Sequence, residues 1–206
     1  MQPASPKMQP EMESVYSKLC NLNSNKSPGP DMLHPRVLYE SRDIIVYPLV
    51  LMYNKSLQSG LVPVDWKLAE VTAIYKKGPK LDRTNYRPVS LTSVCCKMLE
   101  SLIRDHIMSY LLENDLLSNR QYGFIKERST MLKLLQMLGK WTEYLEGGGQ
   151  IDTIYSDFEK AFDKVSKLHS YGLHNVIVKW ICDFLTARKY RVKVNTSYSD
   201  WDDVTM

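Results

Sequence analysis

Cysteine is scarce in this sequence, which argues against the sites that cysteine usually builds in small domains. The 206 residues contain four cysteines, and no two of them are spaced as C-x-x-C. A zinc site or a disulfide framework would need paired cysteines at short, regular spacings. We therefore expect reduced, buried thiols at Cys20, Cys95, Cys96 and Cys182.

Long hydrophobic runs are also lacking. The longest run, residues 44–53, is interrupted by Pro48 and is far too short to span a membrane. The first residues, MQPASPKMQPEME, have neither the basic start nor the apolar stretch of a signal peptide. We therefore expect an intracellular protein, cytoplasmic or nuclear, without a membrane partner. The composition, 44% hydrophobic and 24% charged, is that of an ordinary globular chain.

Net charge is small, but its distribution is uneven. The formal net charge is only +4, whereas residues 67–104 contain eight basic side chains and three acidic ones. The basic residues are Lys67, Lys76, Lys77, Lys80, Arg83, Arg87, Lys97 and Arg104. This distribution fits either a solvated surface or a face that binds phosphate groups.

The apolar periodicity predicts an α+β fold rich in helices. Helices are expected at residues 15–22, 44–57, 94–112, 131–145 and 176–185, and strands at 69–75 and 190–194, with an extended segment at 85–91. Gly60 should close the second helix in the left-handed conformation, and Asp31 should cap a helix that begins near Pro35. In the helix at 131–145 we expect the apolar stripe to face inward, namely Leu134, Leu135, Leu138, Trp141 and Leu145.

The most informative segment is residues 147–165, GGGQIDTIYSDFEKAFDKV. Its glycines predict a turn, and Ile151, Ile154 and Tyr155 predict a short buried strand that ends at Asp157. The spacing then changes to that of an amphipathic helix. A carboxylate at the end of a strand can bind a metal ion, although an acid on the exposed face of a short helix is the commoner case.

Five segments occur in one order along the chain. They read NKSPGPD at residues 25–31, YKKG at 75–78, NYRPVSLTS at 85–93, QYGF at 121–124 and DFEKAFD at 157–163. In that order they resemble the reverse transcriptase domain of LINE-type (non-long-terminal-repeat) retrotransposons, from about residue 15 to residue 205. The resemblance implies a right-hand polymerase, with fingers at 15–130 and part of the palm at 131–206. The proline- and polar-rich start of the chain predicts a disordered tail at 1–14.

The resemblance also implies roles for individual residues. Lys76 and Arg87 would grip the triphosphate of the incoming nucleotide. Asp157 would be the first catalytic aspartate, and the Phe158 carbonyl a further metal ligand. Phe162 would be the aromatic gate that excludes a ribose 2′-hydroxyl. The implied cofactor is Mg²⁺, as two ions held by oxygen ligands. The implied partners are an RNA template, a DNA primer and deoxynucleoside triphosphates.

The sequence departs from the family pattern in several places. The S-G-x-P-Q-G loop and the tyrosine–x–Asp–Asp hairpin are not among these 206 residues, so we expect the chain to be inactive alone. Asp202 and Asp203 follow Trp201 but should be solvated rather than catalytic. Met32 and Glu127 stand where the family has glycine, which predicts strained turns.

The family resemblance leaves other functions open. One alternative is a noncatalytic module that binds RNA or an RNA–DNA hybrid through the basic surface of the fingers. Another is a decayed fragment, in which apolar surface would be exposed.

Overall fold

The computed structural model describes residues 5–154 and 167–204, and the expected α+β class is confirmed. The chain divides into two compact units: Met1–Met108 with Lys164–Met206, and Ser109–Asp163. Helix α4, Val94–Glu113, begins in the first unit and ends in the second. The expected division between fingers and palm near residue 130 stays a prediction. The first unit includes segments from both sides of that residue.

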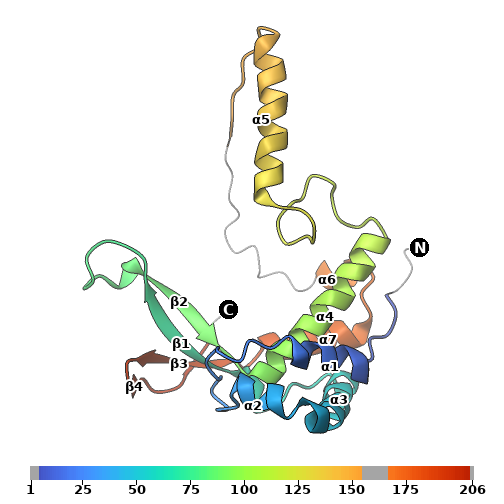
Figure 1. Ribbon diagram of the computed structural model, residues 1–206, viewed down its shortest axis with the longest axis vertical. Coiled ribbons are helices and arrows are strands. Elements are labelled where there is room, and N and C mark those ends of the chain that lie inside the picture. The colour runs from blue at the N-terminus through green and yellow to red at the C-terminus, as the bar shows by residue number, and fades with distance from the viewer. Residues whose placement is uncertain (1–4, 155–166, 205–206) are drawn as a thin grey trace. The chain divides into compact units, whose positions relative to one another are not determined.

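The first unit contains a helical layer and a sheet (Figure 1). Its helices are α1 Met12–Cys20, α2 Pro35–Glu40, α3 Arg42–Ser59, the first part of α4, α6 Lys167–Ser170 and α7 Asn175–Leu185. Short 3-10 turns lie at Val64–Lys67 and Arg83–Asn85. Gly60 ends α3 in the left-handed conformation as expected, with φ 68°.

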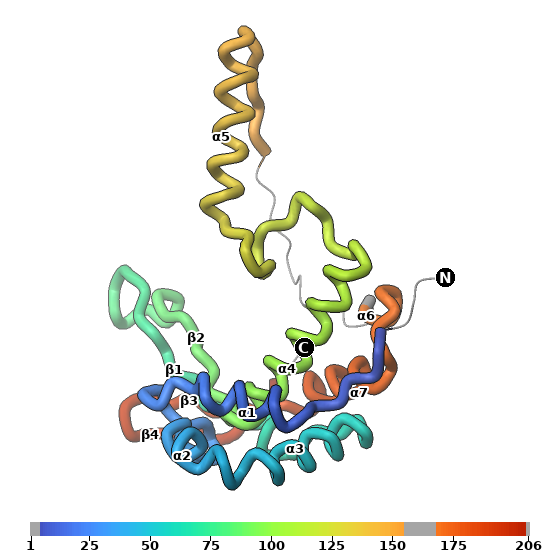
Figure 2. The backbone as a smooth tube through the Cα atoms, turned by 45° about the vertical axis from the view of Figure 1, so that its right-hand side comes forward, coloured from blue at the N-terminus to red at the C-terminus, as the bar shows by residue number. Residues whose placement is uncertain are grey.

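The sheet places β1 at its centre. Its strands are β1 Leu68–Tyr75, β2 Tyr86–Leu91, β3 Lys189–Val194, β4 Ser197–Tyr198 and β5 Asp202–Asp203. β1 pairs with β2 antiparallel and with β3 parallel, while β4 and β5 both pair with β3. The β1–β2 hairpin projects away from the helices of the first unit, as both views show (Figures 1 and 2).

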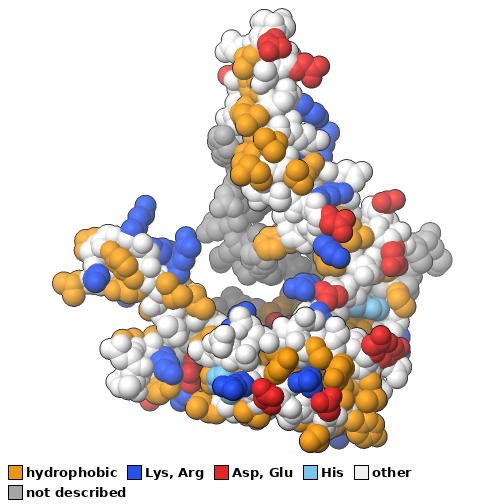
Figure 3. Space-filling view, viewed as in Figure 1, with side chains coloured by type: hydrophobic (Ala, Val, Ile, Leu, Met, Phe, Trp, Pro, Cys, Tyr) orange, Lys and Arg blue, Asp and Glu red, His pale blue; other side chains and the backbone are white. Residues whose placement is uncertain are grey.

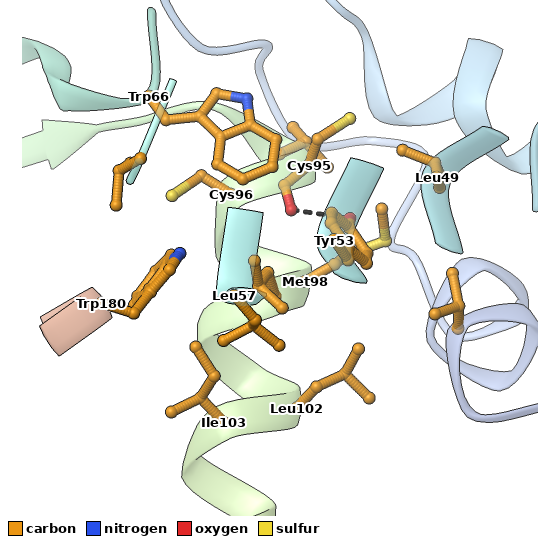
Figure 4. Close-up of a cluster of buried hydrophobic side chains, with 14 of the residues drawn as sticks. Leu49, Tyr53, Leu57, Trp66, Cys95, Cys96, Met98, Leu102, Ile103 and Trp180 are labelled. Atoms are coloured by element: carbon orange, nitrogen blue, oxygen red, sulfur yellow. Dashed lines mark hydrogen bonds between the residues drawn. The ribbon is translucent and has the colours of Figure 1, made fainter. Parts of the chain in front are cut away.

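The core of the first unit lies between α1, α3, α4 and α7 (Figure 4). The buried Tyr53 hydroxyl donates to the Cys95 carbonyl over 2.8 Å, and its ring meets Trp66 edge to face. The Trp180 indole N–H donates to Ser56 Oγ over 2.9 Å, so each buried polar tip has a partner. Because desolvation disfavours the phenolate, burial raises the pKa of Tyr53.

The cysteines divide into two classes. Cys95 and Cys96 are buried in α4, as expected, and burial raises the pKa of both thiols. The expectation of burial is wrong for Cys20 and Cys182, which are exposed. Cys20 is the last residue of α1. Cys182 lies on α7, whose buried residues include Ile177 and Trp180 but not Cys182.

Histidine side chains cap α2 and α7. α2 is capped by His34, whose Nδ1 accepts from the Arg36 amide over 3.1 Å, and not by Asp31. Asp31 instead accepts from the Leu33 amide, within its own turn. His174 caps α7 in the same way. Within the expected tail, Ser5 is buried and its amide donates to the Gly172 carbonyl, so residue 5 is anchored.

The second unit is described by α5, Thr130–Glu146, and the loops beside it. Ser129 caps α5, because its Oγ accepts from the Leu132 amide. The expectation of an inward stripe is wrong in the described part of this unit, since no α5 residue is buried. The leucines of the stripe are 44–58% exposed, at Leu134, Leu135, Leu138 and Leu145. Residues 151–154 form no strand, and Ile154 is exposed.

Candidate nucleotide-binding surface

Strand register puts two of the predicted site residues on the same face of the β1–β2 hairpin. Arg87 pairs with Ile74, and the Lys76 amide donates to the Asn85 carbonyl over 2.8 Å, which extends the ladder by one step. Residues directly opposite in antiparallel strands share a face, as do residues two apart in one strand. Lys76 and Arg87 are therefore diagonal neighbours on one face, and both are exposed.

The turn that follows Lys76 is held by side chains of β1 and of the 3-10 turn before β2. Gly78 adopts φ 91°, and a Cβ there would lie 2.6 Å from Asn85 Nδ2, so only glycine fits without displacing that side chain. Asn85 Nδ2 donates to the Pro79 carbonyl over 3.0 Å, and the Tyr75 hydroxyl donates to the Gly78 carbonyl. Lys76 and Lys77 of the YKKG segment therefore lie at a turn that these hydrogen bonds hold in place.

The basic run at residues 67–104 separates into two parts in the structure. Lys67 Nζ lies 3.0 Å from Asp183 Oδ2, and Arg104 Nη2 lies 2.8 Å from Asp105 Oδ1. Burial alone would raise the pKa of Asp183, but hydrogen bonds from the Val62 amide and Lys67 lower it overall. Neither Lys67 nor Arg104 therefore offers an unpaired charge to a ligand.

The bases on the hairpin are different. Five exposed side chains there have no carboxylate within ion-pair distance among the described residues, namely Lys76, Lys77, Lys80, Arg83 and Arg87. Lysine and arginine side chains gather toward the tip of the hairpin (Figure 3). The only acid between residues 76 and 87 is Asp82, whose carboxylate is occupied by Thr84. Lys97 on α4 is also exposed without an ion-pair partner, so the hairpin holds five of the six bases of this run that have no carboxylate partner among the described residues.

A buried carboxylate anchors the same sheet face, and sequence reasoning missed it. Glu70 is 4% exposed and accepts hydrogen bonds from the Arg191 guanidinium, with Nε at 3.2 Å. Register pairs Glu70 with Arg191 and Thr72 with Lys193, which places Arg191 and Lys193 on the same face of the sheet as Lys76. A charged residue inside an otherwise apolar strand was the signal that could have revealed this pair.

Arg191 is held between two aromatic rings as well. Its guanidinium carbon lies 4.1 Å from the Tyr198 ring centre and 4.7 Å from the Trp201 ring centre. Trp201 therefore has a packing role beside β3. Asp202 and Asp203 pair with β3 as the short strand β5, and both are exposed, which confirms the expectation that they are solvated.

The loop with NKSPGPD packs against the last two residues of the NYRPVSLTS segment, just before α4. A Cβ on Gly29 would lie 2.5 Å from the Thr92 carbonyl oxygen and 2.8 Å from the Ser93 nitrogen. Two segments about sixty residues apart thus meet backbone to backbone. Met32, in the same loop, has φ 58°, and Glu127 in the second unit has φ 65°, which confirms the conformations expected where the family has glycine.

The remaining predicted site residues, Asp157, Phe158 and Phe162, lie outside the described residues. Among residues 5–154 and 167–204, no group of three or more histidine, cysteine, aspartate or glutamate side chains could hold a metal ion. In that same part of the chain no helix is long and apolar enough to cross a membrane.

Residues 74–201 match the protein family described as reverse transcriptase (RNA-dependent DNA polymerase). The chain belongs to this family. The match begins in β1 and includes the hairpin that carries Lys76 and Arg87. The relatives that the chain matches are named as polymerases of transposons and mobile elements, which confirms the resemblance to LINE-type reverse transcriptases.

Three relatives from Drosophila illustrate the likeness. The chain is 27% identical to a probable RNA-directed DNA polymerase from transposon BS of Drosophila melanogaster, over 91% of this chain and 21% of the relative. It is 32% identical to the RNA-directed DNA polymerase from mobile element jockey of Drosophila funebris, over 79% and 18%. It is 27% identical to a probable enzyme from transposon X-element of Drosophila melanogaster, over 73% and 17%. The chain spans about a fifth of the length of these curated relatives.

Proposed function

We propose that this chain is part of an RNA-directed DNA polymerase that extends a DNA primer on an RNA template. The observation that carries the proposal is the placement of Lys76 and Arg87 on one face of a braced hairpin, in a chain of the reverse transcriptase family. The named relatives are polymerases, and no observation favours the noncatalytic binding module.

In this proposal the hairpin belongs to the fingers and binds the triphosphate of a deoxynucleotide. Lys76 supplies a point charge, and the planar Arg87 guanidinium donates two parallel hydrogen bonds to phosphate oxygens. Arg87 is followed by Pro88, which restricts its backbone to the extended region and so limits where its side chain can reach. Residues 15–130 would form the fingers and residues 131–206 part of the palm.

Asp157 and the Phe158 carbonyl would supply oxygen ligands for Mg²⁺, the ligand type this ion prefers. When bound, the ions would lower the pKa of the primer 3′-hydroxyl and neutralise the triphosphate. Phe162 would contact the deoxyribose and exclude a 2′-hydroxyl. We also propose that the 206 residues by themselves do not extend a primer, because one carboxylate and one carbonyl cannot fix two Mg²⁺ ions in octahedral geometry.

The test uses a protein that joins this chain to the S-G-x-P-Q-G loop and Asp-Asp hairpin of the family. Extension of a labelled DNA primer on an RNA template should be abolished by Asp157→Asn and retained by Asp152→Asn, an exposed acid nearby. Phe162→Val should raise incorporation of ribonucleotides. Loss of a charged contact is worth about 1.5–3 kcal/mol, so Lys76→Ala or Arg87→Ala should raise the deoxynucleotide KM about tenfold or more.

Three outcomes would contradict the proposal. Extension that survives Asp157→Asn would remove Asp157 from the site. An unchanged deoxynucleotide KM in both hairpin variants would remove the hairpin from triphosphate binding. Extension by the 206-residue chain alone that disappears in Asp157→Asn would show that our account of the ligands is wrong.

A further inference from the structure

Helix α3 is apolar on two opposite faces, and the first unit covers one of them. The covered face contributes to the core the residues Val46, Leu49, Tyr53 and Leu57. The opposite face exposes Ile44 at 80%, Tyr47 at 58% and Leu51 at 53%. Hydrophobic side chains gather over α3 at the lower edge of the space-filling view (Figure 3). A helix that is apolar all round is normally enclosed on every side, so this exposed face is a candidate interaction surface.

The exposed face of α3 ends in a groove of about 310 Å³. Met52 and Lys55 line the groove from α3, and Leu61 and Val64 line it from the segment that follows the helix. All four of these residues are exposed. The lining contains no carboxylate, so Lys55 gives the groove a positive charge in an otherwise largely apolar surface.

The wall of the groove is held in place before any partner binds. Ser56 Oγ donates to the Leu61 carbonyl over 2.7 Å, which ties the segment after α3 back to the helix. The Val62 amide donates to Asp183 Oδ2 over 2.7 Å, which ties the same segment to α7. Because the groove is preformed, a partner that fills it does not have to order this segment first.

The two ends of this face complement each other in shape. Ile44 projects near the start of α3, whereas the groove lies beside its end. If two copies pack α3 against α3 antiparallel, about an axis between residues 48 and 51, Ile44 of each copy lies over Lys55 and the groove of the other. Tyr47 of each copy then lies over Met52 of the other. Such reciprocal contacts are the mark of a two-fold symmetric interface.

The charges on α3 show the same complementarity. Asp43 is exposed in the first turn of the helix, and Lys55 is exposed near its end. Neither has an ion-pair partner among the described residues, although Asp43 Oδ1 accepts from the Tyr16 hydroxyl over 2.8 Å. Antiparallel packing brings Asp43 of each copy toward Lys55 of the other, whereas parallel packing would place like charges together.

We propose that two copies of this chain form a symmetric dimer through antiparallel packing of α3. The 18 residues of α3 extend about 27 Å, and a helix with its side chains is about 10–12 Å wide, so the face and the adjoining segment offer about 500 Å². Two copies together bury about 1,000 Å², which is near the lower limit for a specific interface. The dimer is therefore weak, with a dissociation constant of about 1–100 µM. This inference does not rest on the proposed polymerase function.

The test is sedimentation equilibrium of the 206-residue chain from about 1 to 300 µM, a range that brackets the expected dissociation constant. Leu51→Asp places a charge beside the two-fold axis and should leave the chain monomeric throughout this range. Leu135→Asp is the matched control, because it makes the same change at another exposed helical leucine, on α5. The control should dimerise like the unchanged chain, and both variants should keep its melting temperature.

A charge reversal tests the antiparallel direction separately. Asp43→Lys and Lys55→Asp should each weaken the dimer about tenfold, since each turns two attractive pairs of the symmetric interface into repulsive ones. D43K/K55D in one chain restores both pairs and should dimerise about as tightly as the unchanged chain. Three results would overturn the proposal: an unchanged chain that stays monomeric, a dimer lost in L135D rather than in L51D, or a double reversal no tighter than either single one.

Discussion

Replacing Gly29 by alanine should destabilise the first unit through one steric contact. The added Cβ would lie 2.5 Å from the Thr92 carbonyl oxygen and 2.7 Å from its carbon, where ordinary contact begins near 3.4 Å. The contacted atoms are backbone, so no side-chain rotation can relieve the overlap of about 0.9 Å. Either residues 28–30 move off the start of α4, or α4 itself shifts.

The magnitude follows from two opposed terms. Overpacking of a close-packed site costs about 1–3 kcal/mol. Alanine restricts the unfolded chain and returns about 0.4–1 kcal/mol. Taking the middle of each range, the free energy of unfolding should fall by about 1.3 kcal/mol. Each kcal/mol lowers the melting temperature by about 2–4 °C in a unit of this size.

The assay is urea unfolding followed by tryptophan fluorescence, because Trp66 and Trp180 are buried in the core of this unit. Gly139→Ala is the matched control, since a Cβ there has nothing within 4 Å. Gly139 lies within α5 in the second unit, where alanine favours the helix by up to about 1 kcal/mol. An unchanged urea midpoint in Gly29→Ala would refute the backbone contact between this loop and Thr92.

Three further changes test separate features. Met32→Gly should stabilise the chain by up to about 1 kcal/mol in urea unfolding. Glycine removes the left-handed strain at this position, but it also gives the unfolded chain more conformational entropy, which cancels part of the gain. A destabilised variant would contradict the strain. Arg191→Leu should cost up to about 3–5 kcal/mol, because it leaves the buried carboxylate of Glu70 with only Lys193 Nζ, 4.0 Å from Oε2, as an ion-pair partner. Adding Glu70→Gln should recover much of that loss, and an absence of recovery would contradict the ion pair. Cys182 should react with a thiol reagent in the folded protein while Cys96, whose pKa burial raises, reacts only on unfolding; equal rates would contradict the burial.

The sequence by itself determined the local elements and the family. Periodicity located α3, α4, α7 and β1, and glycine chemistry located the left-handed end of α3 at Gly60. The order of five short motifs identified the reverse transcriptase family before any fold was known. These features depend on residues close together in the chain, whose spacing fixes which side chains share a face.

Tertiary structure decided which charges are free and which faces are covered. A count of bases does not distinguish Lys67 from Arg87. In the structure Lys67 pairs with Asp183, 116 residues away in sequence, whereas Arg87 has no carboxylate partner among the described residues. The apolar stripe of α5 and that of α7 have the same period, yet only α7 has buried residues. Periodicity says which side of a helix is apolar, whereas burial requires a partner surface that long-range packing must supply. For the same reason, the partner of the buried Glu70 is known only from the pairing of β3 with β1, which places Arg191 opposite it.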